Sequence, residues 1–241
     1  MYTRCIVSDS WRAGRSGVVA MGAQPRMFPS RYWHNAQYLP FYIVDGQYAG
    51  KNSERTRPLV EKWMPRGYPA LFVEYRGRGL EWFKEEQPYL FDWMDHKRDE
   101  RKRASAMPDL GKHGNGGPLG EEFQTMRRTD NHFYWLSTSG VKEACLNDAN
   151  AWKNERTAAT LQGHISEGNQ ISLNVRGIRD VTLWLSREMI DFTKPLTVRL
   201  NGGTVYVNRQ VAPSLTTLLE DLYQRGDRQR LFWAKLEFDK L

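Results

Sequence analysis

Long hydrophobic runs are missing from this sequence of 241 residues. No stretch approaches the ~18–20 consecutive apolar residues that a membrane-spanning helix needs, so we expect no membrane span. The first ten residues also lack the basic start and long apolar core of a signal peptide. Taken as given, the sequence predicts a cytoplasmic protein, although a chain cut from a longer exported precursor has the same appearance.

Cysteine is scarce, with Cys5 and Cys145 the only two. This number excludes a disulfide framework, and no cysteine–histidine spacing is typical of a zinc site. The five histidines are scattered, with none four residues from another, so we expect neither a metal nor another cofactor. The net charge of +7 permits weak attraction to polyanions. No fingerprint of a nucleic-acid-binding module accompanies it, so no specific nucleic-acid partner is expected.

The first hundred residues contain three short apolar runs that read as buried strands. They are Ser16–Gly22, Leu39–Asp45 and Ala70–Tyr75. Residues 54–64 carry apolar side chains at helical spacing, and a second helix is expected to open at Pro88. Alternation of strands and helices indicates parallel strands joined by right-handed crossovers. We therefore predict a partial α/β domain over residues 1–104, with a thin core.

The second half of the chain has a different pattern. Residues 105–130 are rich in glycine and proline and are predicted to be a linker. Short alternating runs then recur through residues 131–241, and Asn201-Gly202-Gly203 is a strong hairpin signal. Ser214 is placed to cap a short helix. The predicted fold is α/β plus all-β, with an antiparallel β-sandwich-like domain over residues 131–241.

The stretch Leu71-Phe-Val-Glu-Tyr-Arg-Gly-Arg-Gly-Leu-Glu-Trp-Phe83 carries a family resemblance. It resembles the last strand and helix of α/β-hydrolases of the dienelactone-hydrolase and prolyl-oligopeptidase type. Residues 1–104 are similar to the part of that fold downstream of the nucleophile. Val181–Ser186 and Arg225–Gln229 are similar to segments in the β-rich extension of bacterial relatives. The resemblance implies a hydrolase scaffold whose ligands bind at the carboxyl ends of the strands.

The chemistry that the resemblance implies needs a serine, a histidine and an acid. The sequence contains no Gly-x-Ser-x-Gly pentapeptide. The family's second acid, in the turn after Asp45, is replaced by Ala49, and the catalytic histidine position is Leu80. Since loss of one member removes most of the rate, we expect no working triad of the family type.

Other groups remain near the predicted strand ends. Asp45 and Glu81 are the candidate catalytic carboxylates, because two acids ~5–10 Å apart can act as general acid and base on a glycosidic bond. The candidate binding residues around them are His34, Trp33, Arg78 and Trp82. The competing interpretation is structural. In it, Asp45 caps a turn and Glu81 serves a helix N-terminus, where the dipole favours carboxylates.

Three functional hypotheses follow from these residues. The chain is a degenerate hydrolase relative, a hydrolase of esters or glycosides that uses the strand-end carboxylates, or an inactive structural or binding protein with a glycan or protein partner. In the third, the missing part of the parallel sheet is supplied from outside. Because a free strand edge invites pairing, we expect a homo-oligomer formed through the Ser16–Gly22 edge.

Overall fold

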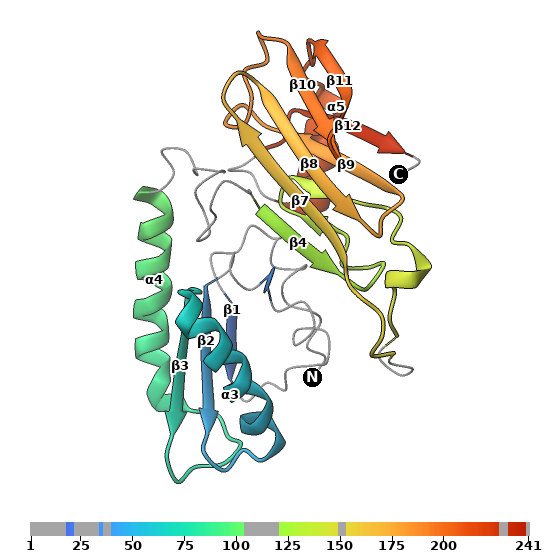
Figure 1. Ribbon diagram of the computed structural model, residues 1–241. Helices are drawn as coiled ribbons and strands as arrows, with labels where there is room; N and C mark the ends of the chain where they lie inside the picture. Colours follow the sequence, from blue (N-terminus) through green and yellow to red (C-terminus); the bar gives the residue numbers. More distant parts are fainter. Residues whose placement is uncertain are drawn as a thin grey trace. The chain divides into compact units, whose positions relative to one another are not determined.

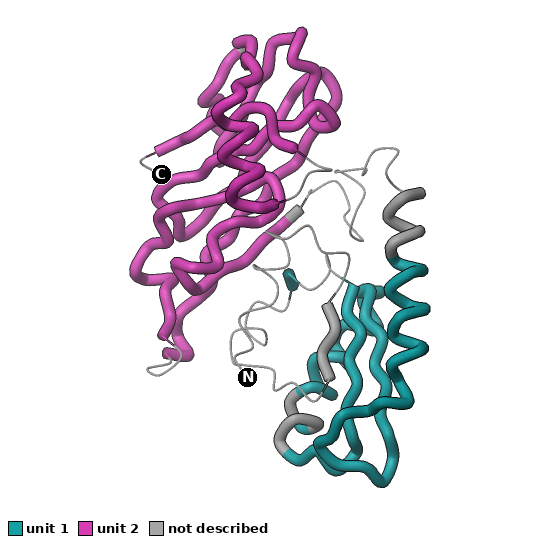
Figure 2. The backbone as a smooth tube through the Cα atoms, turned by 180° about the vertical axis from the view of Figure 1, so that it is seen from behind, with its two compact units in different colours: residues 1–10, 15–106 teal, residues 11–14, 107–241 magenta. Residues whose placement is uncertain are grey.

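The computed structural model describes residues 18–21, 34–35, 40–103, 121–148, 153–226 and 231–239. The chain divides into two compact units, shown in teal and magenta in Figure 2. Unit 1 comprises residues 1–10 and 15–106, and unit 2 comprises residues 11–14 and 107–241. The fold is mixed, with few helices and several sheets, and most of its elements are strands. The sequence pattern also predicts a short helix over residues 4–14, which lie outside the described residues.

Unit 1 contains a three-stranded sheet in the order β1-β2-β3 (Figure 1). Its strands are β1 (Val18–Met21), β2 (Phe41–Gly46) and β3 (Ala70–Tyr75). Both pairings are parallel, with Val18 opposite Phe41 and Phe41 opposite Ala70. The expected parallel arrangement of the three strands is therefore present.

Unit 1 has helices over residues 54–63 and from Pro88 onward, as predicted, and two short 3-10 helices that were not predicted. They are α3 (Lys51–Trp63), η2 (Met64–Arg66), η3 (Lys84–Glu86) and α4 (Gln87–Arg103). Pro88 stands in the first turn of α4, where its missing amide hydrogen costs little. Gly67 adopts a left-handed conformation with φ of 68° and ends the helical segment.

The two helices cover opposite faces of this sheet. On one face, the ring of Phe41 stacks on Trp63 of α3, 5.2 Å between centroids. On the other, Tyr42 and Val44 join Phe83 and Leu90 in a buried cluster, so this face lies under η3 and α4. The alternation follows from the strand period of two, which sends successive side chains to opposite faces.

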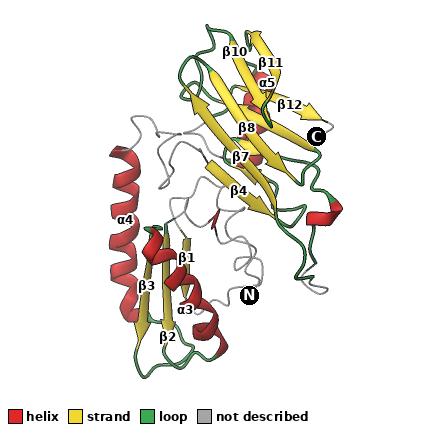
Figure 3. Ribbon diagram, in the orientation of Figure 1, coloured by secondary structure: helices red, strands yellow, loops and turns green. Residues whose placement is uncertain are grey.

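Unit 2 is built from two sheets (Figure 3). The five-stranded sheet has the order β11-β10-β8-β7-β4, and the four-stranded sheet has the order β12-β9-β6-β5. The strands of the first are β4 (Glu121–Thr125), β7 (Ala159–Ser166), β8 (Gln170–Arg176), β10 (Leu196–Leu200) and β11 (Gly203–Arg209). Those of the second are β5 (His132–Phe133), β6 (Leu136–Ser137), β9 (Asp180–Leu185) and β12 (Ala234–Asp239). A short η4 (Glu143–Cys145) also lies in unit 2.

Two details of the prediction for unit 2 are wrong. The linker was expected to continue to residue 130, but Glu121–Thr125 form β4, which pairs with β7. The sheet was expected to be antiparallel throughout, but β8 and β10 run parallel, with Thr197 opposite Gln170. The cause is topological, since β9, the strand between them in the chain, belongs to the other sheet.

The two sheets of unit 2 pack face to face. Phe123 on β4 stacks on Phe133 on β5 with 5.3 Å between ring centroids. Trp135 is fully buried against β7, where a Cβ on Gly163 would lie 2.4 Å from its ring. The absence of a side chain at position 163 therefore makes room for the largest residue of this core.

Helix α5 (Leu215–Arg225) packs on the outer side of the four-stranded sheet. Lys235 of β12 binds Glu220 at 2.9 Å, and the guanidinium of Arg225 lies 4.5 Å above the Phe232 ring. The predicted cap is present, because Ser214 Oγ accepts a hydrogen bond from Thr217 N at 3.3 Å. The predicted hairpin is also present, with Asn201 and Gly202 both at positive φ between β10 and β11.

Candidate functional site

The loops that follow β2 and β3 join into one surface at the carboxyl edge of the unit 1 sheet. Tyr48 N donates to Arg78 O at 2.8 Å, and Gly77 N donates to Gln47 Oε1 at 2.9 Å. Gly46 makes this approach possible, because a Cβ there would lie 2.2 Å from Gly79 O. This is the edge at which open parallel sheets place their ligands.

Asp45 is buried at the end of β2. Its Oδ1 accepts a hydrogen bond from Gly46 N at 3.0 Å, as expected of a turn-forming aspartate. Asp45 lies opposite Glu74 in the register of β2 and β3, and Arg57 of α3 binds Glu74. Asp45 therefore points to the α3 face of the sheet. Burial raises the pKa of its carboxyl above the ordinary value, and the charge of Glu74 adds to the rise.

Glu81 is exposed and held by Arg78. The guanidinium donates from Nε to Oε1 and from Nη2 to Oε2, both at 2.8 Å. Nη1 of Arg78 lies 3.1 Å from Glu85 Oε1. The hydrogen bonds from Arg78 lower the pKa of Glu81 below its usual range. The same guanidinium lies 5.2 Å and 5.0 Å from the ring centroids of Tyr75 and Phe83, on the α4 face.

The structure brings some of the predicted residues together and separates others. Arg78 and Glu81 form an ion pair. Asp45 lies on the opposite, α3 face of the sheet, where the charge of Glu74 adds to the rise in its pKa. Trp82 follows Glu81 and is exposed. His34 is half-buried in a short turn before β2. Trp33 lies outside the described residues.

A group of three side chains that the sequence did not indicate lies beneath Arg78. Glu86 is buried, and its two carboxylate oxygens accept hydrogen bonds from the hydroxyls of Tyr42 and Tyr75, the latter at 2.6 Å. The hydrogen bond to Glu86 is the main cause that raises the pKa of Tyr75 to about 12. Burial is the main cause that raises the pKa of Tyr42. The register of β2 and β3 puts both tyrosines on one face. Only the strand period of two, applied to both predicted strands, could have indicated this placement from the sequence.

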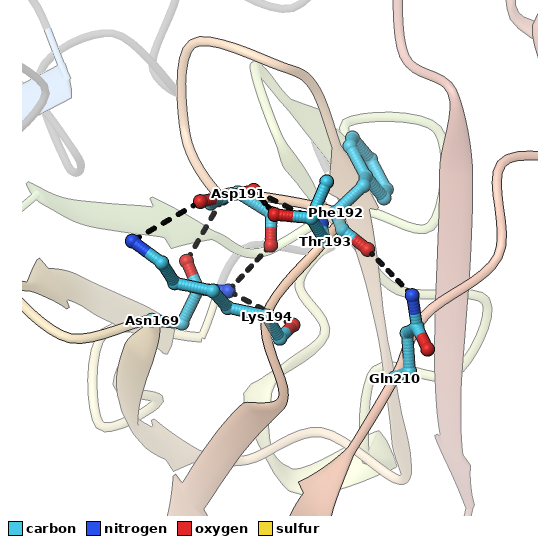
Figure 4. A network of polar contacts seen from close by, with 6 residues as sticks. All are labelled: Asn169, Asp191, Phe192, Thr193, Lys194 and Gln210. Carbon is cyan, nitrogen blue, oxygen red and sulfur yellow. Dashed lines mark hydrogen bonds and ion pairs between the residues drawn. The ribbon is translucent and has the colours of Figure 1, made fainter.

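Unit 2 contains a polar network at the turns that flank β8 and β10 (Figure 4). Asn169 exchanges hydrogen bonds with the backbone of Asp191, and Asp191 Oδ1 accepts from Thr193 N and Oγ1 at 2.9 Å and 2.6 Å. Lys194 Nζ lies 3.2 Å from Asp191 Oδ2. The Thr193 hydroxyl lowers the pKa of the Asp191 carboxyl. These contacts tie the turn before β8 to the turn before β10.

The described ranges contain no candidate metal site and no candidate membrane-spanning helix. Within them, no cluster of three or more His, Cys, Asp or Glu side chains is arranged to hold a metal ion. No helix in these ranges has the length and apolar character needed to cross a bilayer. Cys145 is buried beneath Gly177, where a Cβ would lie 2.4 Å from its sulfur.

Comparison with known proteins gave no match of any kind. No protein-family model matches the chain, and neither the curated proteins nor the solved structures contain a match.

Proposed function

We propose that the chain is a degenerate relative of the α/β-hydrolases that acts by binding a partner rather than by cleaving a bond. The relationship rests on the strand–turn–helix stretch Leu71–Phe83 and on the positions where the family's acid and histidine are replaced by Ala49 and Leu80. The observation that favours binding over catalysis is the engagement of Arg78 with both oxygens of Glu81.

The contacts with Arg78 make the Glu81 carboxylate unsuited to act as a general acid, a base or a nucleophile. A general acid must hold a proton near the working pH, whereas the ion pair lowers the pKa of Glu81. A nucleophile or base needs an oxygen aimed at substrate, whereas both oxygens of Glu81 accept hydrogen bonds from Arg78. Glu81 instead fastens the loop after β3 to the α4 face.

The surface best suited to a partner is the edge formed by the loops after β2 and β3. Tyr48, Leu80 and Trp82 are 70%, 60% and 58% exposed there. Aromatic and aliphatic side chains held open at such an edge suit the face of a sugar ring or an apolar protein segment. The partner we propose is accordingly a glycan or a protein.

A second copy of the chain is the partner that we propose for β1, the edge strand of the unit 1 sheet. β1 is an edge strand of the described sheet, and its pairing with β2 leaves its outer side without a described neighbour. Parallel strands favour neighbours on both sides. We therefore propose that the Ser16–Gly22 edge pairs with the same edge of another chain.

One observation favours the competing candidate, a hydrolase of ester or glycosidic bonds. The pKa of Asp45 is raised and that of Glu81 is lowered, and a pair of carboxyls displaced in opposite directions is the arrangement of acid and base in glycosidases. Their placement on opposite faces of the sheet opposes this candidate, because acid and base must reach the same bond.

A turnover panel separates the two candidates. We expect the purified chain to hydrolyse nitrophenyl esters and nitrophenyl glycosides no faster than buffer. If hydrolysis is found and falls in both Asp45→Asn and Glu81→Gln, the binding proposal is refuted. Trp82→Ala is the matched binding variant, and we expect it to lose affinity for a glycan or protein ligand of the native chain while its circular dichroism stays unchanged.

A further inference from the structure

The outer strand of the five-stranded sheet in unit 2 carries the features of an interface. β11 is at the edge of this sheet, with β10 on its inner side. Val205 and Val207 are 45% and 59% exposed on it. An edge strand offers unpaired backbone groups to another chain, and proteins protect it with charge, proline or β-bulges. From Gly203 to Asn208 the strand has no charge and no proline, and Arg209 is its first charged residue. Its register with β10 shifts on both sides of Tyr206, so its inner side is irregular.

The sequence of β11 is complementary to itself when reversed. In an antiparallel pair centred on Tyr206, Val205 stands opposite Val207 of the partner subunit, and Thr204 stands opposite Asn208 of the partner subunit. Apolar residues then oppose apolar ones, and polar residues oppose polar ones. Arg209 falls opposite Gly203, so no like charges face each other across the pair.

We propose that β11 pairs with β11 of a second copy across a two-fold axis at Tyr206, joining two five-stranded sheets into one. The self-complementary register identifies the occupant as another copy, because an isologous interface requires one patch to match itself. The two valines that each edge exposes would be covered by the same pair of valines from the other chain. This proposal is independent of the proposed function, which concerns unit 1 alone.

A charge exchange tests both the interface and its register. Val207→Lys places a lysine against Val205 of the partner subunit at two symmetric positions, and we expect the mass measured by light scattering to fall by half or more. The double variant Val205→Glu/Val207→Lys places opposite charges across both positions in the proposed register, and we expect it to restore the native mass. In a parallel, in-register pair the same double variant would place like charges opposite each other and would not recover.

The control is Leu215→Lys on α5, where the leucine is 72% exposed. We expect this variant to keep the native mass. Circular dichroism of all variants confirms that each one folds. The proposal is overturned if the native chain is monomeric at micromolar concentrations, if Val207→Lys keeps the native mass, if Leu215→Lys alone dissociates it, or if the folded double variant does not recover.

Discussion

The hydrogen bonds from Tyr42 and Tyr75 to Glu86 allow the stability of the variant Glu86→Gln to be predicted. The neutral amide retains one acceptor oxygen and replaces the other with a donor, so one tyrosine hydroxyl loses its acceptor and the other keeps an uncharged one. Hydrogen bonds to charged groups contribute ~1.5–3 kcal/mol each, and Tyr42 and Glu86 are both buried. We therefore expect Glu86→Gln to lower the free energy of unfolding in urea by ~1.5–3 kcal/mol. The neighbouring exposed carboxylate gives the matched control, Glu85→Gln, for which a much smaller loss is expected.

Titration of the tyrosines in Glu86→Gln separates the two causes of their raised pKa values, which are burial and the contact with Glu86. Glu86 is the main cause for Tyr75, so in Glu86→Gln we expect the pKa of Tyr75 to fall from about 12 toward the ordinary value near ~10. Tyr42 keeps a raised pKa, because burial is its main cause. Tyr68 is the internal control, since burial raises its pKa without Glu86. Nuclear magnetic resonance of isotope-labelled tyrosine measures the three separately.

The sign of the pH dependence follows from the raised values. A hydroxyl whose pKa is higher in the folded state stabilises the fold fully below the unfolded pKa near ~10. That stability is lost as the pH rises toward the folded pKa of Tyr75, about 12. The native chain should therefore lose stability over this interval, and Glu86→Gln should lose less. An unchanged Tyr75 titration in Glu86→Gln would refute the role assigned to the carboxylate.

Two further predictions concern Asp45 and β1. The pKa of Asp45 is raised, so its ionised form destabilises the fold above that pKa. Asp45→Asn keeps an acceptor for Gly46 N, and we expect it to raise the urea midpoint at neutral pH but not at pH values where Asp45 is protonated. A midpoint that falls at neutral pH would contradict this. If the β1 edge pairs as proposed, light scattering of Val207→Lys should still report a dimer, and a monomer would rule out pairing through β1.

Much of the fold can be read from local pattern. The bounds of β3 agree with the predicted strand, because Ala70–Tyr75 is an apolar run between turn signals. The Asn201-Gly202-Gly203 hairpin follows from the need for positive φ. β4 was missed because its residues, Glu121–Thr125, are mostly polar and directly follow a glycine-rich run. The parallel contact of β8 with β10 has no local signal at all.

The candidate site was less predictable because it depends on which way side chains point. The sequence places Asp45 and Glu81 after neighbouring strands, and this adjacency favours one shared edge. The strand register places the side chains of Asp45 and Glu74 on the α3 face. Glu81 instead pairs with Arg78 on the α4 face. The buried position of Glu86 was not predicted, because an acid two residues before Pro88 is typical of an exposed helix start.

In both units, some exposed apolar side chains lie close in sequence to charged groups that are paired within the same unit. In α5, the ion pair of Asp221 with Arg225 is buried, and Leu219 and Tyr223 on the same helix are exposed. In unit 1, Arg78 holds Glu81 and Glu85 while Trp82 is open to solvent. If these surfaces bind a partner as proposed, we expect buried apolar area to supply most of the binding free energy, because the neighbouring charges are already paired. The net charge of +7 would then affect the association rate more than the choice of partner.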